Sequence, residues 1–148
     1  MTSGQWVLVV SLVLAVGFGV FRAWKDGRFS GTHRVRGLSE TTAAPEPGVL
    51  DGHELAAELG ERATLLQFSS AFCAPCRATR RILADVAAVV PGVTHVEVDA
   101  EHHLELVRRL GIVRTPTTLV LDAGGHEVSR AAGAPRKEQV LAALAESV

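Results

Sequence analysis

Residues 49–148 are predicted to form an α/β domain with a mixed central sheet flanked by helices, preceded by one N-terminal transmembrane helix. Three observations predict this architecture. Helical and strand-like apolar patterns alternate through the first part of the domain, as they do when helices cover a parallel sheet. A hairpin pattern and a last helical pattern then follow, which adds antiparallel strands. A long apolar run near the start of the chain accounts for the separate helix.

The apolar run covers residues 6–21, which are apolar or glycine apart from one serine. A helix of that length reaches about 24 Å, short of the roughly 30 Å of a hydrocarbon core. Extending the span to residues 5–23 makes it long enough if the Arg22 side chain reaches the interface. Trp6 and Trp24 would then lie in the two interfacial belts. A signal peptide and a buried helix are the alternatives, but a secretory signal normally begins with basic residues, so we expect a retained membrane anchor.

Positive charges follow the apolar run and predict its orientation. The segment after the run carries five basic residues against one acidic residue: Arg22, Lys25, Arg28, Arg34 and Arg36, with Asp26. By the positive-inside rule, the N-terminus should lie outside and the domain in the cytoplasm. Residues 24–48 combine glycine, serine, threonine and proline with no apolar periodicity, so we expect them to form a flexible linker.

Capping residues and apolar spacing predict the first elements of the domain. Asp51 has the residue type of an N-cap for a helix over 51–59, which Gly60 would end. Residues 64–68 form a short apolar run bounded by charged and small residues, which is typical of a buried strand. A helix should follow the Cys-x-x-Cys motif and end at Pro91-Gly92, because apolar residues recur there at helical spacing.

The later elements are shorter. Residues 93–98 alternate weakly and predict a strand, and residues 104–110 predict a short helix. A β-branched strand is expected at 117–121, followed by a hairpin turn at 122–125 and a partner strand at 127–132. The terminal helix should turn three apolar side chains inward: Val140, Leu141 and Leu144.

The chain has only two cysteines, and both lie in the tetrapeptide Cys73-Ala74-Pro75-Cys76. Two thiols cannot complete a four-ligand zinc site or build a disulfide framework, so a redox-active dithiol remains. The N-terminus of the following helix favours the Cys73 thiolate through its unpaired N–H groups and its dipole. We therefore expect Cys73 to be the nucleophile and Cys76 the resolving cysteine.

The stretch Leu-Leu-Gln-Phe-Ser-Ser-Ala-Phe-Cys-Ala-Pro-Cys-Arg at residues 65–77 resembles the active-site segment of thioredoxins. Val-Asp-Ala-Glu at 98–101, Leu-Gly-Ile-Val-Arg-Thr-Pro-Thr at 110–117 and the late Gly133 fall where that family has its own signatures. The resemblance covers about residues 50–148 and implies a thioredoxin-like fold.

By this resemblance Pro116 should be cis and should lie beside the dithiol. The backbone of Thr115 would then pair with an incoming substrate strand, which is β-augmentation. The resemblance also assigns substrate contacts to the residues that flank or separate the cysteines: Phe72, Ala74 and Pro75.

Four positions depart from the family pattern. Phe72 stands where thioredoxins usually carry tryptophan, and Ala74 replaces the usual glycine. Gln67 occupies the place of a buried aspartate below the second cysteine, and His95 that of its lysine partner. A glutamine cannot accept the Cys76 proton. His95 is therefore a candidate for proton transfer, and a satisfied structural histidine is the alternative.

Other candidate sites are weaker. His102 and His103 stand beside Glu101, but we interpret them as polar residues at a helix start, and we expect no metal and no cofactor. Arginines 77, 80 and 81 are interpreted as a solvated face. The domain has ten Lys or Arg against thirteen Asp or Glu and no basic stripe, so nucleic acid is not expected as a partner.

The sequence thus predicts a membrane-tethered thiol–disulfide oxidoreductase. Proline before the second cysteine resembles the reducing members of the superfamily, so we expect reduction of protein disulfides, with an unidentified electron donor. The alternative is a non-catalytic thioredoxin-like binding or assembly module with a redox-sensitive dithiol. The absence of the usual aspartate and tryptophan supports that alternative.

Overall fold

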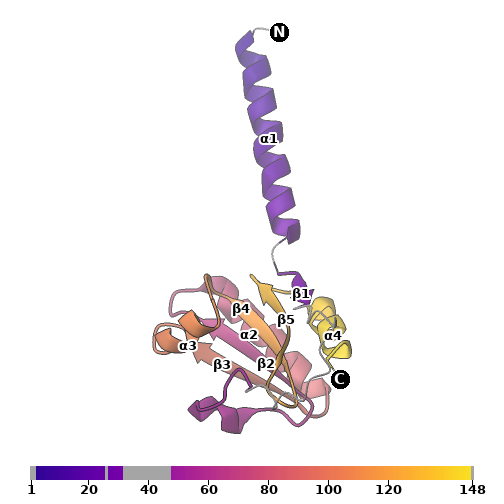
Figure 1. The fold of residues 1–148 in the computed structure, drawn as a ribbon. Helices are drawn as coiled ribbons and strands as arrows, with labels where there is room; N and C mark the ends of the chain where they lie inside the picture. The colour runs from indigo at the N-terminus through magenta and orange to yellow at the C-terminus, as the bar shows by residue number, and fades with distance from the viewer. Residues whose placement is uncertain (1–2, 26, 32–47, 148) are drawn as a thin grey trace, which may run out of the picture.

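A five-stranded mixed sheet forms the centre of the domain in the computed structural model, which describes residues 3–25, 27–31 and 48–147. The strand order is β1-β5-β4-β2-β3, and helices pack against the sheet (Figure 1). The strands are β1 (Phe29–Gly31), β2 (Ala63–Ser69), β3 (Val93–Asp99), β4 (Thr117–Asp122) and β5 (Glu127–Ala132). The helices are α1 (Ser3–Lys25), the 3₁₀-helix η1 (Glu54–Glu58), α2 (Ala74–Val89), α3 (Leu104–Arg109) and α4 (Lys137–Ala145).

Strand β2 is the centre of the sheet. It pairs in parallel with β3 and antiparallel with β4, and all of its residues are buried. Burial on both faces explains why residues 64–68 lack polar alternation. β5 pairs antiparallel with β4, and β1 pairs antiparallel with β5. The predicted mixed sheet flanked by helices is confirmed.

Two hydrophobic cores lie on the two faces of this sheet. Leu65 points to the core beneath α2 and α4, where Leu83 and Leu144 also lie. Leu66, its neighbour in β2, points to the opposite core, which contains Leu106 of α3 and side chains of η1. Because successive side chains of β2 point to opposite faces, helices on both sides of the sheet pack against this one strand.

The first helix of the domain differs from the prediction. Only Glu54–Glu58 is helical, as a 3₁₀ turn, and its N-cap is His53, whose Nδ1 accepts the N–H of Leu55. Asp51 instead uses Oδ2 to accept the N–H of Gly48 at 2.8 Å. The predicted N-cap thus stabilises the preceding loop, and the α-helix over 51–59 is wrong in type and start.

One inward-facing residue of the terminal helix was also predicted wrongly. Val140 and Leu144 are buried, but Leu141 is 39 % exposed, and Ala143 takes the third inward position. At 3.6 residues per turn, positions 140, 143 and 144 share a face, whereas 141 is rotated by about 100° from 140.

Helix α1 projects away from the domain (Figure 1). Its segment Gly4–Trp24 is long and apolar enough to cross a membrane, a test that a signal sequence would also pass. The strand β1 lies inside the segment 24–48 that the sequence predicts to be a linker, so residues 29–31 are an ordered edge of the sheet. Residues 32–47 of that predicted linker are outside the described part of the chain.

Candidate active site

The dithiol lies where β2 passes into α2. β2 ends at Ser69, and Cys73 is the N-cap of α2, with Pro75 in the first turn, where its missing N–H does no harm. The backbone N–H of Cys76 donates to the Cys73 sulfur at 3.1 Å. The two cysteines form a disulfide. This geometry would also stabilise a Cys73 thiolate after reduction, because the same N–H donor and helix end face the sulfur.

The two cysteines differ in exposure. Cys76 is only 3 % exposed, whereas Cys73 is half-buried and accessible from solvent. A substrate disulfide can therefore approach the Cys73 sulfur more readily than the Cys76 sulfur. Phe72, Ala74 and Pro75 are all exposed around Cys73, and Phe72 is 99 % exposed. An apolar side chain in that state covers no core and is available to a partner.

The loop before β4 is held against the loop that carries the cysteines. The Thr115-Pro116 peptide bond is cis, as predicted. The hydroxyls of Ser70 and Thr115 are hydrogen-bonded at 3.0 Å, which joins the two loops. The N–H of Gly133 donates to the Pro116 carbonyl oxygen at 2.8 Å, so the end of β5 supports the same loop.

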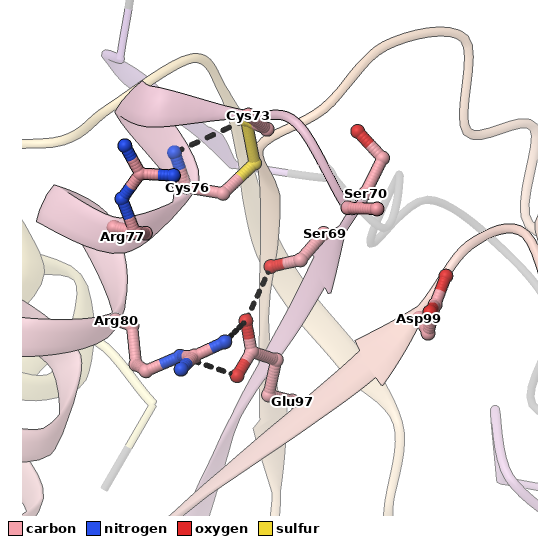
Figure 2. Close-up of a pocket in the computed structure, with 9 residues that line it drawn as sticks. Ser69, Ser70, Cys73, Cys76, Arg77, Arg80, Glu97 and Asp99 are labelled. Atoms are coloured by element: carbon pink, nitrogen blue, oxygen red, sulfur yellow. Dashed lines mark hydrogen bonds and ion pairs between the residues drawn. A yellow bond between two sulfur atoms is a disulfide. The ribbon is translucent and has the colours of Figure 1, made fainter.

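A hollow of about 300 Å³ opens beside the disulfide. Figure 2 shows polar side chains lining it together with the two cysteines. They come from the end of β2, the β2–α2 loop, α2 and β3: Ser69, Ser70, Arg77, Arg80, Glu97 and Asp99. The disulfide is thus bordered by a polar, solvent-accessible space.

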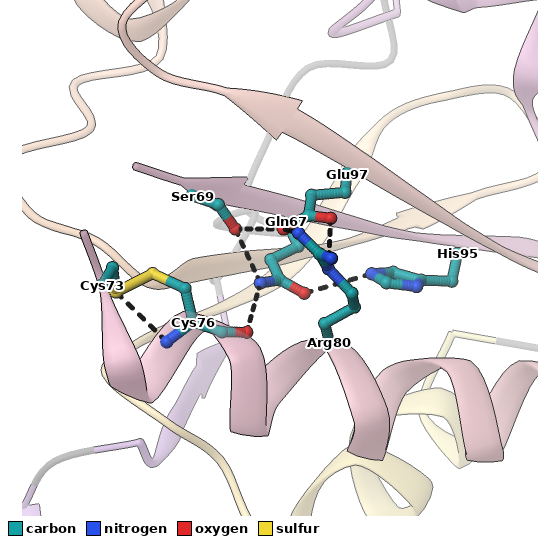
Figure 3. Close-up of polar contacts among 7 residues, drawn as sticks. All are labelled: Gln67, Ser69, Cys73, Cys76, Arg80, His95 and Glu97. Carbon is teal, nitrogen blue, oxygen red and sulfur yellow. Dashed lines mark hydrogen bonds and ion pairs between the residues drawn. A yellow bond between two sulfur atoms is a disulfide. The ribbon is translucent and has the colours of Figure 1, made fainter. Parts of the chain in front are cut away.

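A buried glutamine lies beneath Cys76. Gln67 is fully buried, and its Nε2 donates to the carbonyl oxygen of Cys76 at 3.0 Å and to the hydroxyl of Ser69 at 2.8 Å (Figure 3). Its Oε1 lies 3.1 Å from Nε2 of His95. Since an amide oxygen only accepts hydrogen bonds, Nε2 of His95 must carry a proton. Gln67 and His95, two of the four departures from the family pattern, are therefore in direct contact.

This arrangement limits what His95 can do through Gln67. An amide does not pass protons at neutral pH, so the proton-transfer role expected of His95 would need a route around Gln67. The pKa of His95 lies below its ordinary value, chiefly because burial disfavours the charged ring, an effect that the Glu97 carboxylate partly offsets and Arg80 reinforces. The ring is therefore held neutral, as a hydrogen-bond donor to Gln67.

The sequence did not single out Glu97, although it lies at the same site. Its Oε1 accepts a 2.6 Å hydrogen bond from the Ser69 hydroxyl, and its carboxylate pairs with Arg80 at 2.6 and 2.9 Å. Burial by itself raises the pKa of Glu97, but the hydrogen bonds from Arg80 and Ser69 and the Arg80 charge prevail and lower it. Arg80 is thus an ion-pair partner as well as part of a solvated face.

A signal for Glu97 was present in the strand alternation. Residues 95, 97 and 99 share one face of β3, and Glu97 lies opposite Gln67 in the parallel pairing. Only that register shows that the carboxylate reaches the dithiol hollow. Asp99, by contrast, is engaged by the histidines of the following loop, at 2.9 Å to His102 Nδ1 and 3.0 Å from its own carbonyl to His103 Nδ1. Within residues 3–25, 27–31 and 48–147, no three metal-ligating side chains gather.

Comparisons with known proteins cover the part of the chain that carries this site. The family described as "Thioredoxin-like domain" matches residues 52–147. A thioredoxin of Alicyclobacillus acidocaldarius is 34% identical over 88 residues, which is 59% of this chain and 83% of that protein. Thioredoxin H-type 1 of Nicotiana tabacum is 33% identical over 78 residues, or 53% of this chain and 61% of that protein. The solved thioredoxin of Fasciola hepatica has a TM-score of 0.55 at 22% identity, covering 64% of this chain and 88% of that one, which shows the shared fold.

Proposed function

We propose, from the premise that this chain belongs to the thioredoxin-like family, that it is a protein-disulfide reductase held at a membrane by α1. The family and the dithiol support thiol–disulfide oxidoreductase chemistry. The observation that carries the proposal is the Cys73 sulfur, which caps α2, accepts the N–H of Cys76 and is more exposed than its partner.

The proposed reaction begins with the reduced protein. The Cys73 thiolate attacks one sulfur of a substrate disulfide, and the other substrate sulfur leaves as a thiolate and takes up a proton. Cys76 then loses its proton and attacks Cys73, which releases the second substrate sulfur as a thiol. The substrate gains two electrons and two protons, and the Cys73–Cys76 disulfide remains on the protein. A dithiol donor, either a reductase or a membrane partner, must then return two electrons.

The substrate would bind along the Pro116 loop. The backbone of Thr115 is proposed to pair with an extended substrate segment, as in β-augmentation. Phe72, Ala74 and Pro75 are exposed next to Cys73 and would contact the same segment. The hydrogen bond between Ser70 and Thr115 supports this assignment, because it keeps the two contact loops together.

The membrane part of the proposal places α1 across the bilayer, the N-terminus outside and the domain in the cytoplasm. The apolar stretch Gly4–Trp24 and the basic residues after it support this orientation. Labelling the reduced Cys73 with a membrane-impermeant thiol reagent in intact and permeabilised cells tests the orientation. Labelling of intact cells would place the domain outside and overturn it.

An insulin reduction assay with dithiothreitol as the donor tests the chemistry. Cys73→Ser should lose the turnover, and Cys76→Ser should accumulate mixed disulfides with substrates. Full turnover by Cys73→Ser would overturn the assignment. Slow exchange together with a stable one-to-one complex would instead favour a binding or assembly module.

A further inference from the structure

The end of α1 and the dithiol lie at the same end of the sheet. The pairing places Phe68 opposite Thr117, Thr117 opposite Ala132, and Ala131 opposite Phe29. The last residues of β2 and β5 and the first residues of β4 and β1 therefore form one edge, which we call the dithiol end. β1 and β2 are three strand spacings apart in the sheet order, which corresponds to about 14 Å.

Contacts of Trp24, Gly27 and Arg28 join α1 to this end, and we call these three residues the clamp. The N–H of Gly27 donates to the Ala132 carbonyl oxygen at 3.0 Å, and β1 begins two residues later. Gly27 has φ +78°, and a Cβ at this position would lie 2.2 Å from the carbonyl oxygen of Ala134. Only glycine fits this approach. The Arg28 guanidinium lies 5.0 Å from the centre of the Trp24 ring, which ties the clamp back to the helix.

The surface at the junction has the composition of a membrane interface. A hollow of about 550 Å³ lies between the end of α1 and the sheet. The residues that line it include three aromatic residues and two arginines: Phe21, Trp24, Phe29, Arg28 and Arg114. Aromatic rings and arginines are the residues that gather at the level of lipid headgroups. Arg114 immediately precedes the cis Thr115-Pro116 bond, so one residue belongs both to this hollow and to the loop that carries Pro116.

Exposed apolar side chains mark the same end. Val113, in the loop leading to Pro116, is 91 % exposed, and Phe72, beside Cys73, is 99 % exposed. Figure 1 shows α1 leaving the domain from the side to which the β5 arrow points. The membrane-entering helix, the apolar loops and the dithiol therefore face the same way.

We propose that α1 and the clamp hold the dithiol end towards the bilayer surface, so that the preferred substrate is a protein disulfide presented close to that surface. This inference rests on the membrane anchor of the proposed function. A long free tether would let the dithiol reach disulfides at any height, whereas a clamp of this length restricts it to a layer next to the headgroups.

The test uses the full chain in phosphatidylcholine vesicles that also carry a lipid-anchored peptide with one disulfide. Polyproline spacers of about two or about twelve residues place that disulfide about 6 Å or about 37 Å from the anchor. Dithiothreitol starts the reaction, and Cys73→Ser measures the background. We expect the short-spacer peptide to be reduced about tenfold faster or more, because the clamp raises its effective concentration. Equal rates would overturn the inference.

Two glycine variants test the clamp itself. Gly27→Ala should abolish the spacer preference and keep its turnover on soluble insulin. Gly52→Ala is the matched control, because Gly52 also has a positive φ, +75°, but a Cβ there meets nothing within 4 Å. A spacer preference retained by Gly27→Ala would overturn the role of the clamp. Flotation of the vesicles distinguishes failure of the membrane anchor from failure of the inference. A chain that does not float with the vesicles contradicts both the anchor and the inference. A chain that floats and reduces insulin but shows no spacer preference contradicts the inference alone.

Discussion

Gln67 donates a hydrogen bond to the carbonyl oxygen of Cys76 at 3.0 Å, so an amide lies directly beneath the proposed resolving cysteine. The amide satisfies the first turn of α2 but offers no base. In the proposed reaction we therefore expect the Cys76 proton to leave through the adjacent hollow, which the Ser69–Glu97 pair borders.

Gln67→Asp should speed the resolution of mixed disulfides. A buried aspartate has a raised pKa and can take the Cys76 proton, and we expect a gain of about tenfold or more. The variant should lose about 1–3 kcal/mol of unfolding free energy, because the shorter acid cannot replace both hydrogen bonds that the amide donates to Cys76 and Ser69. Stopped-flow resolution kinetics and urea unfolding measure the two effects. Gln67→Asn is the control, because asparagine has the shape of aspartate but no acidic group. It should lower the unfolding free energy without speeding resolution. An equal gain in resolution rate in Gln67→Asn would rule out the aspartate as a base.

Glu97 should make stability depend on acidity. Its folded pKa lies below the ordinary value of 4.5, so its contribution is fully present above that value and is lost as the pH falls through the folded pKa. The pair with Arg80 is partly exposed, and we expect Glu97→Gln to cost about 1 kcal/mol or less at pH 7. Urea unfolding across pH should show the difference from wild type shrinking below pH 4.5. Asp85→Asn, an exposed carboxylate on α2, is the control and should show a smaller difference.

His95 should affect the free energy of unfolding over a higher pH range than Glu97 does. Burial lowers its folded pKa below the ordinary 6.5, so the native state prefers the neutral ring. Stability from this group is present above 6.5 and declines as the pH falls through the folded pKa, since the unfolded chain takes up the proton first. His95→Gln should flatten this slope in urea unfolding. If His95→Gln also moved the pH profile of mixed-disulfide resolution, a proton route around Gln67 would be indicated.

Two leucines of α4 should respond differently to truncation. Leu144→Ala leaves a cavity beneath α2 and should cost about 2–4 kcal/mol of unfolding free energy. Leu141 is 39 % exposed, and Leu141→Ala should cost less than about 1 kcal/mol. Thermal and urea unfolding compare them within one helix. Equal losses would contradict the orientation of α4.

The sequence predicted the chemistry-bearing residues better than their surroundings. The Cys-x-x-Cys motif singled out the two cysteines, and the resemblance to thioredoxins implied the cis Pro116 and drew attention to Gln67 and His95. The alternation along β3 indicated the face on which Glu97 lies, but its contact with Ser69 depends on the β2–β3 register, which no local spacing specifies.

The element boundaries show the same limit. β1 is three residues long, contains serine and glycine, and is specified by its pairing with β5 and not by its own β-propensity. Asp51 is a residue type that commonly caps helices, but its carboxylate accepts the N–H of Gly48 at 2.8 Å and stabilises the loop instead. In both cases a tertiary partner decided between local options.

The position of β3 at the border of the sheet gives its charged side chains a second consequence. Among the described residues β3 pairs only with β2, so one row of its backbone N–H and C=O groups faces outward. Such a row can recruit strands from other molecules, and charged residues along it discourage that stacking. Glu97 is one of these charged residues of β3, so we expect variants that neutralise it to associate more readily, and light scattering at several protein concentrations checks this alongside the redox assays.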